Sequence, residues 1–421
     1  MDLVTDNPTR AQPLAVAFVG ALLPGHLLAE YPGASPPGNA FQSGVLNALL
    51  AQGIDTSVIS LRPVSSYPHW PQLFFRGAHG VLREGVPYCQ IGCINAGPIK
   101  TLSAAFTSFV ALLRWARQHR RERRLMLFYN AYNPSAWVGV VAAWLTRSKM
   151  ITIVADVRVP GAGGGGASLL RRMEFHIAVA SLRRVDAIVP VTRNIVADFA
   201  AGLPFLFLDG GVVDDMLAPL PAPALPKPLG GADATRATDS DAFVVLYAGS
   251  LNDMAGVPFL LKAFERIDHP RFRLWITGAG ELEGVVREAA ALDTRIRYFG
   301  MLPRADLLAR YAAADVLVNP NSTTLLTARY VFPSKLLEYL ASGRPVITTA
   351  TPEIAAGYGA LCTVLDREEP QALADAILRV AATPVAVRLA HAAAARGAVI
   401  ERFAWSRQGR RLVQFLEEQS E

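Results

Sequence analysis

The sequence has little charge, few cysteines and no uninterrupted apolar run long enough to cross a membrane. Only 18% of the 421 residues are Asp, Glu, Lys or Arg, whereas an ordinary soluble domain has about 25%. Three cysteines give no basis for a disulfide framework, and Cys89 and Cys93 have no second Cys or His pair nearby that would indicate zinc. Because 52% of the residues are hydrophobic, a disordered chain is excluded. The low charge therefore indicates extensive buried sheet, contact with a membrane, or both.

Two uncharged segments, Ala11–Ala29 and Leu125–Thr146, approach the roughly 20 residues that a transmembrane helix needs. Prolines, a glycine and a histidine interrupt the first segment, and two asparagines and a proline interrupt the second. Asp2 and Asp6 stand where a signal peptide has a basic region. We therefore expect a cytoplasmic protein with neither a span nor a signal peptide.

The strongest shift in composition falls at residues 217–241, where five prolines and a Gly-Gly pair exclude a helix or a central strand. We interpret this segment as a semi-rigid linker. At about 100–200 residues per domain, it separates two predicted domains, residues 1–216 and residues 242–400.

Both halves alternate short apolar runs with amphipathic helical stretches, as buried parallel strands and their covering helices do. The strands predicted in the first half are Leu14–Gly20, Thr56–Ser60, Leu125–Tyr129, Met150–Ala155, Ala187–Val191 and Pro204–Leu208. Those predicted in the second half are Phe243–Tyr247, Arg273–Thr277, Ile296–Phe299, Val316–Val318, Pro345–Thr348 and Leu361–Val364. The alternation predicts an α/β fold of two Rossmann-like, doubly wound domains. Ligands of such sheets bind at the carboxyl ends of the strands, so we expect a central cleft there.

One helix of the second half combines clear boundaries with the elements of a binding site. A proline at its start, and a glycine and a proline after its end, predict a helix over Pro333–Ser342. Its N-terminal N–H groups and Lys335 form a site suited to a diphosphate. Glu338 follows little more than a turn later, where a carboxylate can accept hydrogen bonds from a ribose diol. The alternative is a plain packing helix with a solvated glutamate.

Five short motifs follow one another in this half: Tyr247–Ser250, Gly278–Gly280, Phe299–Leu302, Asp315–Pro320 and Glu338–Val346. The ordered set resembles glycosyltransferase family four, which has the GT-B fold. The likeness covers nearly all of residues 241–405 and, more weakly, residues 14–215. It implies an acceptor-side domain, a nucleotide-sugar-binding domain and a C-terminal helix over residues 401–421 that crosses back to the first domain.

The resemblance also implies roles for individual residues. Glu338 would bind the donor ribose, and Lys335 would help to hold the diphosphate. The backbone of four residues would face the base: Phe299, Gly300, Met301 and Leu302. Further donor contacts are predicted at Gly249, Ser250, Gly278, Gly280 and Ser334.

Three positions depart from the family pattern. Tyr330 replaces the first glutamate of the usual E-x7-E motif, and Ser250 and Ala255 replace two cations. Arg329 and Lys335 are the nearest replacements, and we predict that both act in catalysis on the diphosphate. The block from Phe332 to Tyr339 resembles a branch of the family that acts on bacterial surface glycans.

The first half offers two further candidates. Gly38 and Asn39 are predicted in a loop before a helix that starts at about Ser43, where family members approach the diphosphate and where glycine permits close backbone contact. Asp156 follows the strand Met150–Ala155, where many family members carry a His or His-Asp facing the transferred sugar. Asp156 could bind sugar hydroxyls or act as a catalytic base. The alternatives are an ordinary loop and a capping aspartate.

The formal net charge of +6 belongs wholly to residues 1–225. Residues 100–124 alone hold seven basic side chains and one acidic one, and the stretch Leu102–Ala116 before the arginine cluster is apolar and contains aromatic residues. Such a helix suits the surface of an anionic membrane. A core helix with a solvated basic end is the alternative; nucleic acid is not expected, because no binding module is present.

Together these observations predict a nucleotide-sugar-dependent, hexosyltransferase-like enzyme. It would transfer sugar, with retention, to a glycan or lipid-linked acceptor in the synthesis of a bacterial surface polysaccharide or glycolipid, and would be peripheral on the inner face of the plasma membrane. We expect no cofactor and no metal, since no convincing D-x-D motif is present. Two alternatives are a catalytically degenerate GT-B protein that binds nucleotide or glycan, and a GT-B nucleotide-sugar 2-epimerase.

Overall fold

The computed structural model describes residues 12–31, 33–82, 85–130, 135–157, 159–161, 169–218 and 242–421. The chain divides into two compact units, one formed by Met1–Asp209 with Gln408–Glu421 and the other by Gly210–Arg407. The predicted linker lies outside the described residues from position 219 onward.

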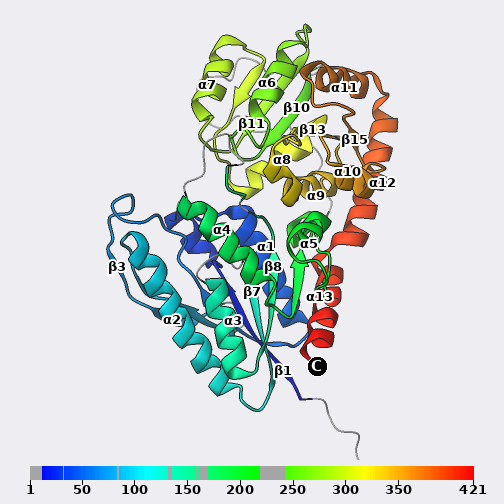
Figure 1. The fold of residues 1–421 in the computed structure, drawn as a ribbon. Coiled ribbons are helices and arrows are strands. Elements are labelled where there is room, and N and C mark those ends of the chain that lie inside the picture. Colours follow the sequence, from blue (N-terminus) through cyan, green and yellow to red (C-terminus); the bar gives the residue numbers. More distant parts are fainter. Residues whose placement is uncertain are drawn as a thin grey trace, which may run out of the picture. The chain divides into compact units, whose positions relative to one another are not determined.

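The first unit contains a seven-stranded sheet with the order β4-β5-β2-β1-β7-β8-β9 (Figure 1). Its strands are β1 (Leu14–Gly20), β2 (Asp55–Ser60), β4 (Ala78–Val81), β5 (Pro87–Gln90), β7 (Arg123–Tyr129), β8 (Lys149–Val154) and β9 (Ala187–Pro190). All neighbours are parallel except β4, which runs antiparallel to β5. A separate antiparallel pair is formed by β3 (Phe74–Phe75) and β6 (Cys93–Ile94). Every residue of β1 is buried, so this strand is covered on both faces.

Helices cover the first sheet. They are α1 (Pro36–Ala51), α2 (Gly97–Gln118), α3 (Ser135–Thr146), α4 (Leu169–Leu182), α5 (Arg193–Phe199) and the 3-10 helix η1 (Gly25–Glu30). Figure 1 shows α2, α3 and α4 side by side. The last helix, α13 (Trp405–Ser420), belongs to this unit from Gln408 onward and packs on α1 through Gly409 and Ala48. Among the described residues, no helix has both the length and the apolar character needed to cross a bilayer.

The second unit contains a six-stranded parallel sheet with the order β12-β11-β10-β13-β14-β15. Its strands are β10 (Phe243–Ala248), β11 (Phe272–Thr277), β12 (Ile296–Tyr298), β13 (Val316–Asn319), β14 (Val346–Thr348) and β15 (Thr363–Val364). Its helices are η3 (Asp214–Met216), α6 (Val257–Glu265), α7 (Glu283–Leu292), α8 (Arg304–Ala313), η4 (Leu326–Tyr330), α9 (Ser334–Ala341), α10 (Pro352–Tyr358), α11 (Pro370–Ala382) and α12 (Val385–Phe403). One large core cluster packs α6, α7 and α11 against one face of the sheet, through alternate residues of β10: Phe243, Val245 and Tyr247.

The predicted α/β class of two Rossmann-like sheets is confirmed, with one strand corrected. Pro204–Leu208 is not a strand: it forms only an isolated bridge, between Phe205 and Ile188 of β9. A regular ladder needs an N–H at Pro190, which proline lacks, so one hydrogen bond of the series is missing, although the N–H of Leu208 still donates to the carbonyl of Pro190 at 3.1 Å. The antiparallel elements β3, β4 and β6 were not predicted, because they are short and have no apolar run of their own.

Substitution of Gly278 should destabilise the second unit. Gly278 follows β11 with φ +135°, and a Cβ there would lie 1.8 Å from the carbonyl oxygen of Gly249. Gly278→Ala should therefore cost about 2–4 kcal/mol of unfolding free energy, measured by urea denaturation. Gly284→Ala is the control, since a Cβ at this position in α7 meets nothing within 4 Å. Equal stability of the two variants would contradict the expected clash.

Candidate active site

Three strand-to-turn segments of the second unit lie against one another at the carboxyl ends of its strands. The N–H of Gly249 donates to the carbonyl of Thr277 at 3.0 Å, and the N–H of Gly278 donates to the carbonyl of Gly300 at 2.9 Å. The next residues of the first two turns are also joined, through the N–H of Leu251 and the carbonyl of Ala279. The structure thereby brings together five residues predicted to bind the donor: Gly249, Ser250, Gly278, Gly280 and Gly300.

In the segment after β12, the ring of Phe299 is packed against other side chains, whereas Met301 is exposed. The ring of Phe299 lies edge-on to Trp275 at 5.7 Å, and the guanidinium of Arg310 lies 4.2 Å from the centre of the Phe299 ring. The side chain of Met301 is exposed, and that of Leu302 is half-buried. Because the Phe299 ring is engaged in packing, a base contact at this residue would have to use its backbone, as the resemblance implies.

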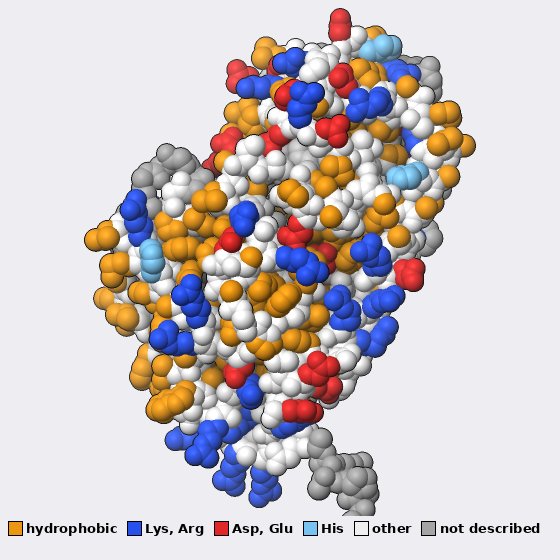
Figure 2. All heavy atoms as spheres, turned by 45° about the vertical axis from the view of Figure 1, so that its right-hand side comes forward, with side chains coloured by type: hydrophobic (Ala, Val, Ile, Leu, Met, Phe, Trp, Pro, Cys, Tyr) orange, Lys and Arg blue, Asp and Glu red, His pale blue; other side chains and the backbone are white. Residues whose placement is uncertain are grey.

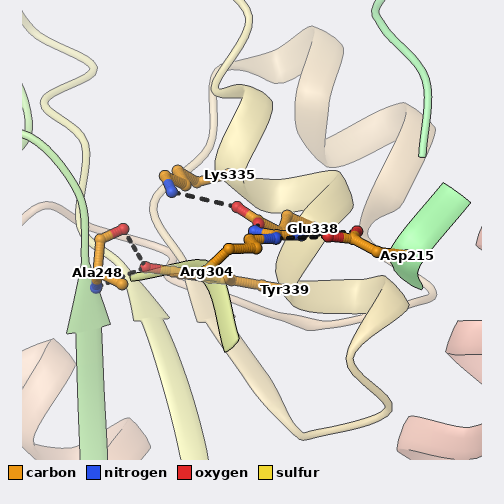
Figure 3. A network of polar contacts seen from close by, with 6 residues as sticks. All are labelled: Asp215, Ala248, Arg304, Lys335, Glu338 and Tyr339. Atoms are coloured by element: carbon orange, nitrogen blue, oxygen red, sulfur yellow. Dashed lines mark hydrogen bonds and ion pairs between the residues drawn. The ribbon is translucent and has the colours of Figure 1, made fainter. Parts of the chain in front are cut away.

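Helix α9 begins one residue later than predicted, with Pro333 as its N-cap, and ends at Ala341, one residue earlier. The hydroxyl of Tyr339, which is fully buried, donates to the carbonyl of Ala248 and accepts from the N–H of the same residue, both at 2.8 Å (Figure 3). Ala248 is the last residue of β10, directly before the turn at Gly249. This double contact therefore fixes α9 relative to the strand end and its turn.

Glu338 lies on α9 with only 15% of its side chain exposed. Its Oε2 accepts a hydrogen bond from Nζ of Lys335 at 3.1 Å, and its Oε1 accepts one from Nη1 of Arg304. Burial raises the pKa of Glu338, but Lys335 and Arg304 outweigh burial and hold that pKa below its ordinary value. Glu338 is therefore an ionised, mostly buried carboxylate, and the alternative of a solvated glutamate is wrong.

Arg304 and Asp215 were missed by the sequence analysis. Nε and Nη2 of Arg304 donate to the two carboxylate oxygens of Asp215 at 2.7 and 2.9 Å, so that Arg304 joins Asp215 to Glu338 (Figure 3). Arg304 directly follows the Phe299–Leu302 segment and Pro303, which was the one available signal. Nothing in the spacing could have indicated that it reaches a glutamate 34 residues later.

The two remaining predicted residues near α9 are exposed. Ser334 is the first residue of the helix, and Arg329 lies in η4, on the segment that leads into it. A small cavity of about 30 Å³ lies beside Pro333. Hydroxyl-bearing side chains contribute to its lining: Ser322, Thr323, Thr349 and Thr351. This volume suits a water molecule rather than a sugar ring.

In the first unit, Asp156 is held beside the carboxyl ends of β7 and β8. Nδ2 of Asn130 donates to Oδ1 of Asp156 at 2.9 Å, and Oδ1 of Asn130 accepts from the N–H of Ala155 at 2.7 Å. Asn130 adopts the left-handed conformation, with φ +48°. Burial raises the pKa of the neighbouring Tyr129, and the charge of Asp156 raises it further. Asn130 was also missed, although a polar residue directly after a predicted strand is a signal for such a position.

The predicted loop at Gly38 and Asn39 is wrong, because both residues lie in the first turns of α1. Ser35 caps this helix by accepting from the N–H of Gly38 at 3.2 Å, and two prolines at its start suit the first turn. The amide of Asn39 donates to the carbonyl of Leu23 at 3.2 Å and accepts from the N–H of Leu23 at 2.8 Å. Asn39 therefore holds α1 against the segment that follows β1.

Only some of the basic side chains of residues 100–124 are exposed in the structure. Three of these cations donate to backbone carbonyls: Lys100 to that of Val64, Arg123 to that of Gln12, and Arg124 to those of Ala116 and Thr146. Four arginines are exposed: Arg114, Arg117, Arg120 and Arg121. They follow three exposed apolar residues of α2, which are Ile99, Leu102 and Phe106. Figure 2 shows hydrophobic side chains gathered over this unit and Lys and Arg side chains at its margin.

One group of described residues has the composition of a metal site. Asp55, His119 and Glu122 place potential ligand atoms within 4.8 Å of one another. Nδ1 of His119 is 2.8 Å from Glu122 and 3.6 Å from Asp55, so the three side chains form a small polar cluster at the end of α2. Asp55 begins β2, whereas ligands of parallel sheets bind at strand carboxyl ends. This group therefore adds nothing to the candidate active site.

Comparison with known proteins identifies part of the chain. Residues 242–383 match the family model described as glycosyl transferases group 1. This segment is a glycosyltransferase domain. The predicted enzyme class, a glycosyltransferase, is thus confirmed. None of the curated proteins matches the chain.

Solved structures share the fold over nearly the whole chain. Alr3699/HepE from Anabaena, in complex with UDP, has a TM-score of 0.68 at 14% identity and covers 96% of this chain and 100% of its own. Sucrose-phosphate synthase from Thermosynechococcus elongatus has a TM-score of 0.65 at 17% identity, covering 96% and 98%. The catalytic domain of starch synthase IV from Arabidopsis thaliana, bound to ADP and acarbose, has a TM-score of 0.67 at 13% identity, covering 97% and 99%. The glycosyltransferase therefore has the predicted GT-B fold.

Removal of the Tyr339 hydroxyl should destabilise the glycosyltransferase domain. Tyr339→Phe leaves two buried backbone groups of Ala248 without a partner, which costs about 1–3 kcal/mol. Tyr311→Phe is the matched control, because Tyr311 is also fully buried and its hydroxyl, which lies beside Glu338, makes no hydrogen bond to the backbone among the described residues. Thermal unfolding should show a clear loss for Tyr339→Phe and little change for Tyr311→Phe. Similar losses in the two variants would contradict this assignment.

Proposed function

We propose that this glycosyltransferase transfers a hexose-like sugar from a nucleoside-diphosphate sugar to a glycan or lipid-linked acceptor. The acceptor would belong to the synthesis of a bacterial surface polysaccharide or glycolipid, as the resemblance to family four and the Phe332–Tyr339 block imply. One observation carries the proposal: Glu338 is held ionised on α9, the helix that is fixed to the glycine turn after β10.

A nucleotide donor fits this arrangement. An ionised carboxylate can accept hydrogen bonds from both hydroxyls of a ribose. The glycines at 249 and 278 let the neighbouring turns pack closely against each other at the strand ends. Two of the solved structures that share the fold contain UDP or ADP. We propose that Glu338 binds the donor ribose and that the backbone of residues 299–302 meets the base.

The chemistry requires stabilisation of charge on the departing diphosphate. Lys335 lies at the start of α9, where the helix dipole also favours an anion. We propose that Lys335, Arg329 and the first turn of α9 stabilise the leaving group, with Gly38 at the start of α1 as a further backbone contact. Preorganised cations and N–H groups of this kind supply the stabilisation that a metal provides elsewhere, so the proposed transfer needs no metal.

Asp156 is the proposed side chain for the sugar end of the reaction. Asn130 holds the carboxylate of Asp156 in place, and we propose that this carboxylate accepts a hydrogen bond from a sugar hydroxyl or takes up a proton. Retention of the anomeric configuration is proposed on the family resemblance.

We further propose that the protein works at the inner face of the plasma membrane, with α2 against anionic lipid. Ile99, Leu102 and Phe106 recur at spacings of three and four residues, and Arg114 and Arg117 continue the row. Phe106 is 68% exposed. Apolar side chains followed by cations on one helix face match the acyl and headgroup layers of a bilayer surface.

Donor binding tests the assignment of Glu338. Glu338→Ala should weaken binding of the cognate nucleoside-diphosphate sugar more than tenfold, about 1.4 kcal/mol, since the ribose loses its acceptor. Binding should be measured by calorimetry with UDP-, ADP-, GDP- and dTDP-sugars. Glu265→Ala, an exposed glutamate of α6, is the control and should bind as the wild type does. Unchanged affinity of Glu338→Ala would remove Glu338 from the site.

Turnover with the same donors distinguishes the two alternatives. Sugar transfer or donor hydrolysis supports the proposal. Nucleotide binding without turnover on any donor or acceptor would favour the degenerate binding protein, which the missing glutamate at Tyr330 and the missing cations motivate. Conversion of UDP-N-acetylglucosamine to its 2-epimer would favour the epimerase.

Vesicle flotation tests the membrane assignment. Phosphatidylcholine vesicles containing phosphatidylglycerol should carry the wild type, and replacement of Arg114, Arg117, Arg120 and Arg121 by Gln should weaken binding more than tenfold, at about 1 kcal/mol per cation. The control replaces four exposed cations of the second unit, which are Lys262, Arg266, Arg271 and Arg379. Equal flotation of both variants would show that α2 is not the contact.

A further inference from the structure

Arg304 and Asp215 come from segments far apart in the chain and meet beside Glu338. Arg304 is the first residue of α8, and Asp215 lies in η3, directly before the chain enters the predicted linker. The Nε and Nη2 edge of the guanidinium is paired with both oxygens of Asp215, and Nη1 contacts Glu338 (Figure 3). Figure 3 shows Arg304 between the two carboxylates.

The geometry of the guanidinium makes these contacts interdependent. A guanidinium is planar, so a two-point contact along one edge fixes the direction of its remaining N–H groups. The Arg304 side chain is 39% exposed, and solvent alone would leave its orientation free. Asp215 therefore determines where Nη1 of Arg304 points, and that point is Oε1 of Glu338.

The contacts to Glu338 leave room for a ligand. A carboxylate has about four acceptor positions, two on each oxygen. Arg304 takes one position on Oε1 and Lys335 takes one on Oε2. The buried Tyr311 hydroxyl also lies beside this carboxylate but makes no hydrogen bond to it, so each oxygen keeps one position, which is the number that a ribose diol requires.

A second arginine fastens the same segment to α9. Arg396 donates from Nη2 to the carbonyls of Met216 and Leu217 at 3.1 and 2.7 Å, and from Nε to the carbonyl of Ala341, the last residue of α9, at 2.9 Å. Residues 215–217 are thus tied to the middle of α9 through Arg304 and to its end through Arg396. Asp215 is consequently held in a fixed place relative to the helix that carries Glu338.

We propose that Arg304 and Asp215 are positioning residues for the donor ribose: Asp215 orients Arg304, and Arg304 holds the Glu338 carboxylate so that one acceptor position on each oxygen faces the 2′- and 3′-hydroxyls. This inference rests on the proposed function. Arg304 and Asp215 would thus support the site through Glu338 and would not contact the donor themselves.

The test measures recognition of the ribose hydroxyls separately from overall affinity. The probes are UDP, ADP and GDP, each compared with its 2′,3′-dideoxy analogue by calorimetry. The wild type should prefer the normal nucleotide of one base by about tenfold or more, and Glu338→Ala should abolish that preference. Asp215→Asn and Arg304→Gln should reduce the preference at least threefold while their affinity for the dideoxy analogue stays near that of the wild type. Arg304→Lys keeps the charge without the planar two-edged geometry, so it should give an intermediate preference.

The control breaks an Asp–Arg pair of similar geometry elsewhere in the second unit. Asp293 contacts Arg295 at 2.7 Å, and Asp293→Asn should leave the ribose preference unchanged. A circular-dichroism melt of each variant identifies any that fails to fold; Asp215→Asn, which nearly preserves shape, is then the deciding variant.

The outcomes separate the two proposals. If the wild type prefers the ribose form and Asp215→Asn and Arg304→Gln keep that preference, or lose affinity equally for both analogues, the positioning role is overturned and the proposed function stands. If the wild type binds none of the nucleotides, or binds them without a ribose preference, the assignment of Glu338 to the ribose fails, and the positioning role fails with it.

Discussion

The carboxylate of Glu338 is the charge on which the arrangement of the second unit's site depends. A mostly buried carboxylate is costly unless cations and hydrogen bonds compensate for its lost hydration. Lys335 supplies one cation from the same helix, and Arg304 supplies the other from the start of α8. Arg304 is partly buried in turn and is paired with Asp215. One ionised group thus requires three segments of the chain to meet at one place.

Tyr339, the next residue along α9, belongs to the core rather than to the polar site. Successive residues of a helix point about 100° apart, so Tyr339 faces the core while Glu338 faces the polar site. The Tyr339 hydroxyl satisfies both backbone groups of Ala248 and sets the helix against the end of β10. Two neighbouring residues therefore connect the fold to the site: one fixes the helix to the sheet, and the other carries the charge. The low charge of the sequence follows from the same architecture, since β1 and β10 are buried along their whole lengths.

Local patterns predicted the parts of the structure that local physics controls. The run Leu14–Gly20 is β1 as predicted, and α9 lies within one residue of its predicted ends because proline and glycine mark helix boundaries locally. Prediction failed where neighbours decide. Pro204–Leu208 has a strand-like composition but lies beside Pro190, which lacks the N–H that a regular ladder needs. Gly38 was placed in a loop before a helix that starts at about Ser43, yet Ser35 and the prolines that follow it start the helix before Gly38.

The sequence by itself determined the α/β class, the order of the strand-to-turn motifs and the candidate residues on α9, because each depends on residue types at short spacings. Only the tertiary structure decided that the turns at Gly249, Gly278 and Gly300 contact one another and that Arg304 joins Asp215 to Glu338. It also decided which cations of residues 100–124 are exposed and which bond to backbone carbonyls. The reason is physical: the partners of Arg304 lie 89 and 34 positions away, and whether such groups meet depends on how the strands and helices pack.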